Sequence, residues 1–94
     1  MFNAAGKNPV SWTTNGQTIY GTGTLIKVYW FNPANSGDTF TITDLAGNVK
    51  LTGRCENSNQ SQIFDESNGL AAQQFLNGLV CYQISSGTLE VTIA

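Results

Sequence analysis

The sequence contains no histidine, and only 11% of its residues carry a charge. Histidine is the commonest general base in enzymes and a common zinc ligand, so its absence excludes a Ser/His/Asp triad and a histidine-based zinc site. Five carboxylates are candidates for acid–base chemistry: Asp38, Asp44, Asp65, Glu66 and Glu90. Most of them lie in turn sequences, where Asp normally bonds nearby backbone amides. We therefore expect no enzyme activity, no catalytic residues and no cofactor.

Positive charge is scarce as well, since four Lys and Arg residues face six Asp and Glu residues and give a net charge of −2. Binding to nucleic acid needs concentrated positive charge, so nucleic acid is not an expected partner. The longest apolar run, Val28–Phe31, is far shorter than the roughly 20 residues of a membrane span. The first residues also lack the apolar core of a signal peptide, so we expect synthesis in the cytoplasm and no membrane partner.

The two cysteines, Cys55 and Cys81, have neither a Cys-x-x-Cys spacing nor a partner base. We interpret them as buried thiols; the sequence leaves open whether they pair, because a disulfide needs Cα atoms within about 7 Å. Oxygen ligands gather at Asp65, Glu66 and Asn68, but their spacing does not match a calcium-binding loop. No metal site is therefore expected.

Uncharged polar residues are abundant instead: Thr, Asn, Ser and Gln together supply 34 of the 94 residues. They predict a neutral surface that forms hydrogen bonds. Hydrophobic residues make up 40% of the chain and aromatic residues 11%, which is more than a disordered chain contains. A chain of this length supports one small domain of marginal stability, so partner subunits are expected to help stabilise it.

Apolar and polar residues alternate along several short segments, as they do in half-buried strands. In the longest segment, residues 25–31, Ile26, Val28 and Trp30 share one face, and Leu25, Lys27, Tyr29 and Phe31 share the other. We expect this segment to be a central strand. Asn15–Gly16 predicts a hairpin turn, and residues 78–84 and 88–94 are expected to be adjacent antiparallel strands. Between residues 57 and 77 the pattern weakens.

Together these segments predict six to eight short strands and no helix. This favours an all-β fold, a small antiparallel β-sandwich or jelly-roll. Residues 1–8 contain one strong apolar anchor, Phe2, and we interpret them as an N-terminal arm. Residues 9–94 are then a single β-sandwich domain.

Three passages resemble the small all-β virion proteins of tailed bacteriophages: GTGTLIKVYWFNPANSGDTFTITDLAGNVKLTG, NGLVCYQI and SSGTLEVTIA. The matching features are a turn at Gly37–Asp38, a strand that ends at Asp44, a strand that begins at Gly78–Leu79, and a final strand that follows Ser86–Gly87–Thr88. The resemblance implies a structural role on the virion, most often capsid decoration or cement.

The resemblance also implies partners, which are the major capsid protein or other virion proteins, together with copies of the same chain. Phe2, Trp12 and Tyr20 are the candidate contact residues, because exposed aromatic residues and an arm are suited to burial across subunit boundaries. The alternative is a tail fibre, spike or baseplate component that binds a host-surface glycan. For that role the aromatic residues Trp12, Tyr20, Tyr29, Trp30 and Tyr82 are the candidates for a sugar-binding platform.

Overall fold

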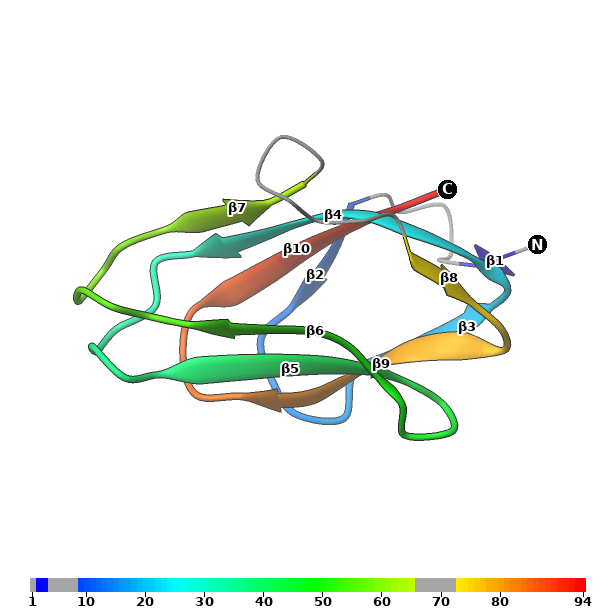
Figure 1. Ribbon diagram of the computed structural model, residues 1–94, viewed down its shortest axis with the longest axis horizontal. Helices are drawn as coiled ribbons and strands as arrows, with labels where there is room; N and C mark the ends of the chain where they lie inside the picture. The colour runs from blue at the N-terminus through cyan, green and yellow to red at the C-terminus, as the bar shows by residue number, and fades with distance from the viewer. Residues whose placement is uncertain (1, 4–8, 66–72) are drawn as a thin grey trace.

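The chain forms two antiparallel sheets that pack face to face (Figure 1). The computed structural model describes residues 2–3, 9–65 and 73–94. No helix occurs among these residues, and the expected all-β sandwich is confirmed. The described strands number ten, more than the six to eight expected, because several of them contain only two or three residues.

The first sheet has five strands in the order β1-β3-β9-β5-β6. They are β1 (Phe2–Asn3), β3 (Thr18–Gly21), β5 (Thr39–Asp44), β6 (Val49–Arg54) and β9 (Gly78–Ile84). β5 is rich in β-branched residues, which fit a pleated, half-buried surface. The turn at residues 44–48 joins β5 and β6 into a hairpin, with Thr41 opposite Thr52.

The second sheet has the order β2-β10-β4-β7, and β8 also pairs with β4. Its strands are β2 (Val10–Trp12), β4 (Gly23–Phe31), β7 (Gln62–Phe64), β8 (Gln73–Phe75) and β10 (Thr88–Ile93). The prediction that residues 25–31 form a central strand is confirmed, since β10 pairs with one side of β4 and β7 with the other. The uncertain segment 57–77 contributes β7 and β8, and residues 66–72 lie outside the described residues.

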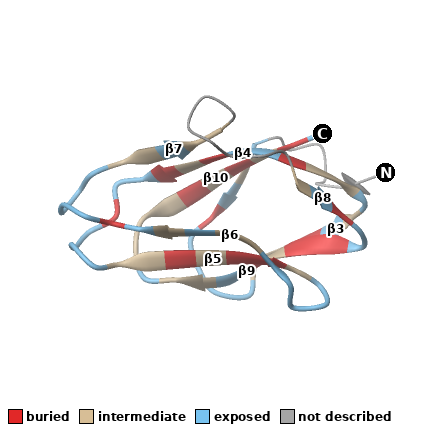
Figure 2. Ribbon diagram, in the orientation of Figure 1, coloured by how far each residue is buried: buried red, intermediate tan, exposed pale blue. Residues whose placement is uncertain are grey.

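The core lies between the two sheets and is almost entirely apolar. Along β10, buried residues alternate with partly exposed ones. Leu89, Val91 and Ile93 are buried as their phase predicts, and Figure 2 shows where buried residues lie along the strands. The buried apolar residues are Trp12, Ile19, Leu25, Val28, Trp30, Phe40, Ile42, Cys55, Phe75, Leu79, Cys81, Leu89, Val91 and Ile93. Inward positions are thus filled by large side chains from both sheets.

A bulge in β4 corrects the predicted faces of this strand. Lys27 lies opposite Thr92 and Leu25 opposite Ile93, so Ile26 has no direct partner in the register. An extra residue of this kind reverses the alternation of side chains beyond it. Leu25 therefore points into the core, whereas Ile26 is exposed, and the prediction that Ile26 shares the buried face of Val28 and Trp30 is wrong.

Two predicted strand pairings are also wrong. The turn at Asn15–Gly16 is present, but it joins β2 of the second sheet to β3 of the first. Similarly, β9 and β10 are not neighbours, because residues 85–87 carry the chain from the first sheet to the second. Turn residues determine that the chain reverses, but in a sandwich the returning strand can join either layer.

An aromatic contact joins the two sheets. The ring of Trp30 in β4 meets the ring of Phe40 in β5 edge to face at 4.9 Å, and Phe64 in β7 meets Phe40 at 5.4 Å. Gly53 in β6 lies directly against Phe40, where an added Cβ would overlap the Phe40 ring. Glycine at this position lets the ring fill the space between the sheets.

We predict that Gly53→Ala destabilises the fold, because the added methyl group displaces Phe40 from its contact with Trp30. Overpacking of this kind costs about 1–3 kcal/mol, which would be measured as a lower midpoint in urea unfolding. Thr52→Ala, an exposed change on the same strand, is the control and should shift the midpoint much less. Equal midpoints for the two variants would contradict the role assigned to Gly53.

Candidate functional site

The three predicted contact residues have different surroundings in the structure. Tyr20 is 65% exposed on β3. Trp12 is only 1% exposed, because it lies opposite Leu89 and faces the core, so it offers almost no area to a partner. Phe2 belongs to β1, whose backbone pairs with β3 opposite Gly21. Residues 1 and 4–8 of the predicted arm lie outside the described residues.

Three exposed apolar residues lie close to Gly78, either in the fold or along the chain, and we call them the Tyr20 surface: Tyr20, Leu45 and Leu76. Tyr20 lies opposite Gly78 in the register, so the two residues share the outer face of the first sheet. Leu45 packs beside Gly78, with its Cγ 3.3 Å from the place of a Gly78 Cβ. Leu76 precedes Gly78 by two residues, and all three apolar side chains are exposed.

The backbone holds the Tyr20 surface in place. The Gly21 N–H donates a hydrogen bond of 3.1 Å to the Asn77 carbonyl, which ties the turn that carries Leu76 to β3. Gly78 has a φ of 146°, and a Cβ there would overlap the Ile19 carbonyl oxygen. Only glycine therefore fits at the centre of this surface. Leu45 and Leu76 are not among the contact residues predicted from the sequence, where their one signal is a leucine in a polar turn.

A second apolar group lies on the outer face of the second sheet, where Phe31 and Ile63 are exposed and Tyr29 is partly exposed. Tyr29 and Ile63 are opposite each other on β4 and β7, and Phe31 follows two residues after Tyr29. The rings of Tyr29 and Phe31 meet edge to face, with centroids 5.8 Å apart and an interplanar angle of 66°. These side chains point away from the core.

A groove of about 420 Å³ opens beside β2. Its lining residues are Pro9, Val10, Ser11, Trp12, Gln17 and Thr18. None of these side chains is an acid or a base at neutral pH. The Gln17 amide oxygen accepts hydrogen bonds from the backbone N–H groups of Thr13 and Thr14 at 2.6 and 2.9 Å. The groove therefore offers shape and hydrogen bonds, without groups for acid–base chemistry.

Asp38 fixes a turn, as predicted. Its Oδ2 accepts a hydrogen bond of 3.2 Å from the Asn35 N–H and one of 2.5 Å from the Ser86 hydroxyl. The Ser86 carbonyl in turn accepts a hydrogen bond from the Trp30 indole at 2.9 Å. The carboxylate thus joins the loop after β4 to the connection between β9 and β10.

Asp44 fixes the β5–β6 turn in the same way. Its Oδ1 accepts hydrogen bonds from the backbone N–H groups of Ala46 and Asn48, both at 2.9 Å. The hydrogen bond from the Asn48 side chain, followed by the backbone bond from Asn48, lowers the pKa of Asp44 below its ordinary value of 3.8. Lys50 lies 3.9 Å away and adds to the same effect. The hydrogen bonds and the lowered pKa both indicate that the Asp44 carboxylate stabilises the turn.

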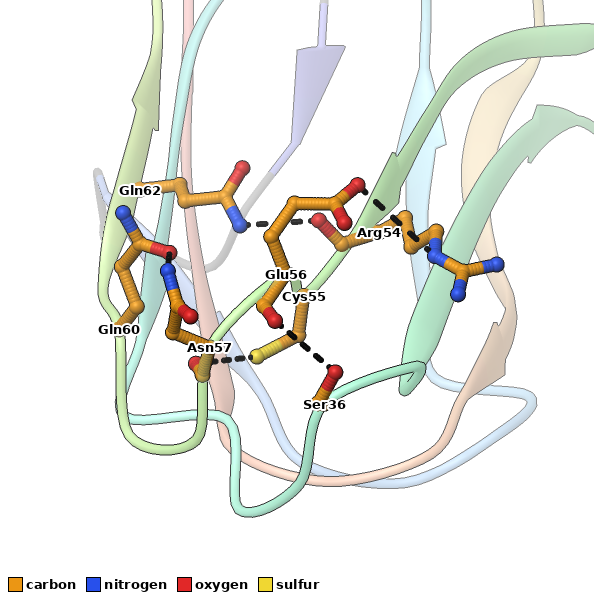
Figure 3. A network of polar contacts seen from close by, with 7 residues as sticks. All are labelled: Ser36, Arg54, Cys55, Glu56, Asn57, Gln60 and Gln62. Atoms are coloured by element: carbon orange, nitrogen blue, oxygen red, sulfur yellow. Dashed lines mark hydrogen bonds and ion pairs between the residues drawn. The ribbon is translucent and has the colours of Figure 1, made fainter.

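A further polar network connects the loop after β4 with the loop between β6 and β7 (Figure 3). It contains Ser36, Arg54, Cys55, Glu56, Asn57, Gln60 and Gln62. The Ser36 hydroxyl donates to the Glu56 carbonyl at 2.9 Å, and the Gln62 amide donates to the Arg54 carbonyl at 2.9 Å. The bonds run within and between the loops, so the network supports the fold at this end of the sandwich.

Both cysteines are buried free thiols, which confirms their interpretation from the sequence. Cys55 Sγ donates to the Asn57 carbonyl at 2.9 Å. Burial raises the pKa of Cys81 to about 11, so this residue carries no thiolate nucleophile at neutral pH.

Metal-ligating residues do not gather in the part of the chain that the structure describes, where no three His, Cys, Asp or Glu side chains form a cluster. Of the oxygen ligands considered in the sequence, Glu66 and Asn68 fall outside that part. Within residues 2–3, 9–65 and 73–94, no helix has the length and apolar character that a membrane crossing requires.

Comparisons with protein-family models, with curated proteins and with solved structures found no match for this chain. The resemblance to phage virion proteins therefore stays a hypothesis, and the exposed surfaces carry the functional argument.

We predict that Asp44→Ala lowers stability near neutral pH more than at about pH 2. The folded pKa of Asp44 is depressed, so its contribution is fully present above the unfolded value of 3.8 and is lost as the pH falls through the folded pKa. Urea midpoints of wild type and variant should therefore converge at low pH. Glu56→Ala, which removes an exposed ion pair with Arg54, is the control. A pH-independent deficit in Asp44→Ala would contradict the assignment.

Proposed function

We propose that this chain is a non-catalytic virion structural protein of a tailed bacteriophage, of the capsid decoration or cement type. The observation that carries the proposal is the Tyr20 surface, an exposed apolar cluster held by hydrogen-bonded backbone on one end of the first sheet. The three passages that resemble phage virion proteins include Tyr20's neighbour Gly21 and the strand β9 that carries Gly78. The partner in this proposal is the assembled capsid shell.

Burial of the Tyr20 surface supplies the binding energy in this proposal. Each 100 Å² of apolar area removed from water contributes about 2.5 kcal/mol, before the cost of association is subtracted. Three exposed apolar side chains on one chain make a small contact area. Such a contact becomes effective where several partner subunits meet, so we expect binding to the assembled shell and weak binding to free capsid subunits.

The N-terminal segment lies next to this surface. Asn3 pairs with Tyr20, and Phe2 pairs with Gly21, so β1 forms the sheet edge beside Tyr20. A contact that covers Tyr20 would therefore also reach β1. This supports including the backbone edge of β1 in the proposed interface beside Tyr20, whereas Trp12 belongs to the core.

Recognition of a host glycan by a fibre, spike or baseplate component is the second candidate. It is supported by Tyr29 and Phe31, which are aromatic and lie opposite the polar residues Glu90 and Thr88. Sugar rings stack best on a flat aromatic platform, however, and the two rings stand at 66° to each other. We therefore rank this function below capsid binding.

We predict that Tyr20→Thr weakens binding to empty capsids at least tenfold, because it removes the largest side chain of the Tyr20 surface. Co-sedimentation with capsids of the phage that encodes the chain measures the affinity and the ratio of chains to capsid subunits. Tyr82→Thr is a closely matched control, because Tyr82 is 66% exposed on the same sheet and does not belong to the Tyr20 surface. Threonine keeps a high strand propensity at both positions.

Two results would contradict these statements. Equal losses in Tyr20→Thr and Tyr82→Thr would show that the Tyr20 surface is not the contact. Absence of saturable binding by the wild-type chain would overturn the decoration proposal, and binding to a glycan array by the same preparation would favour the second candidate.

A further inference from the structure

The outer face of the second sheet combines an apolar centre with charges of both signs. The register places Glu90, Tyr29 and Ile63 side by side on β10, β4 and β7. Phe31 extends the apolar centre along β4 through its ring contact with Tyr29. Lys27 lies two residues before Tyr29 on the same face, because Tyr29 and Lys27 pair with Glu90 and Thr92 on β10.

Lys27 and Glu90 are therefore diagonal neighbours of each other, and Glu90 lies directly opposite Tyr29. Diagonal neighbours in an antiparallel sheet have Cα atoms about 7–8 Å apart. The two ion pairs found in the described part of the chain, Lys50–Asp44 and Arg54–Glu56, involve neither residue. One cation and one anion thus lie next to Tyr29, and neither takes part in the ion pairs of the described residues.

We propose that the partner of this face is a second copy of the chain, packed face to face around a two-fold axis. An interface with two-fold symmetry must be complementary to itself, so every cation needs an anion on the same face. The two-fold axis lies in the plane of the face, at right angles to the line from Lys27 to Glu90, and passes close to Tyr29. Rotation about this axis places Lys27 of each copy on Glu90 of the other. The same axis stacks Tyr29 and Ile63 on their symmetry mates.

The dimensions of the molecule leave room for a dimer interface on this face. The longest dimensions of the molecule are 37 and 27 Å, so a whole sheet face is about 1,000 Å² at most. A standard stable interface buries about 800 Å² per partner. The outer strands β2 and β7 contain three residues each, which is too short for extensive edge-to-edge pairing and favours packing through the faces.

The charge pattern also favours a second copy of the chain over other partners of this face. A uniformly charged partner, such as nucleic acid, would meet one attractive and one repulsive group on the face. The angle between the Tyr29 and Phe31 rings disfavours a flat sugar. The inference does not rest on the proposed capsid contact, because that contact lies on the other sheet and dimerisation is measured on the isolated chain.

The decisive test is a charge exchange between chains, followed by sedimentation equilibrium. The wild-type chain should associate to twice its mass of 10.1 kDa. Lys27→Glu and Glu90→Lys, each alone, should weaken the dimer at least tenfold, because each change creates two like-charge contacts per dimer. An equimolar mixture of the two variants should recover the dimer, because the mixed pair restores both opposite-charge contacts.

Recovery in the mixture reports only on contacts between chains, since positions 27 and 90 stay like-charged within each variant. The control is the matched pair Arg54→Glu and Glu56→Lys, which changes the same charges on exposed residues of β6 and the loop after it. These variants, alone or mixed, should dimerise like the wild type. Circular dichroism of every variant checks that the strands are retained.

A second pair of variants tests the apolar centre. Ile63→Thr should weaken the dimer several-fold, whereas Val49→Thr, a similar exposed change at the edge of the first sheet, should leave it unchanged. The proposal is overturned if the wild-type chain stays monomeric at millimolar concentration, if the mixed charge variants fail to recover, or if Val49→Thr weakens the dimer as much as Ile63→Thr.

Discussion

The contact between Trp30 and Phe40 is the constraint on which the rest of the structure depends. It brings together the central strand of the second sheet and a middle strand of the first, at a ring distance of 4.9 Å. The Trp30 indole also donates to the Ser86 carbonyl, so the same side chain holds the connection that returns the chain from β9 to β10. Once these inward positions are filled, the alternation along each strand decides which side chains face outward.

Both candidate surfaces follow from that alternation. Ile19 faces the core, so Tyr20 faces outward, and Val28 and Trp30 face the core, so Tyr29 and Phe31 face outward. Gly78 then shapes the Tyr20 surface, because a residue without a side chain leaves room for Leu45 next to it. The apolar residues on the two outer faces are thus direct consequences of the packing of the core.

Much of this fold is predictable from the sequence, and the failures have identifiable causes. Alternation predicts the inward residues of β10 along the whole strand, and Phe40 and Ile42 in β5. It fails at Ile26, where a bulge shifts the phase, and turn signals fail at Asn15–Gly16, because a turn does not specify which sheet the next strand joins.

Trp12 was misassigned because one short strand does not reveal which of its faces meets the core. Leu45 and Leu76 lie 31 positions apart in the chain. The pairings of β9 with β3 and with β5 bring Tyr20 and Leu45 to Gly78, two residues after Leu76, and such pairings are not readable from local sequence.

The two proposed contacts constrain each other geometrically. The Tyr20 surface lies on the outer face of the first sheet, and the self-association face lies on the outer face of the second. A dimer formed through the second sheet therefore directs its two Tyr20 surfaces in opposite directions. A smooth capsid shell would accept one of them and leave the other toward solvent, which gives two chains for each occupied site. A site between two projecting capsid subunits would accept both, and the avidity of two simultaneous contacts would then compensate for the small area of each.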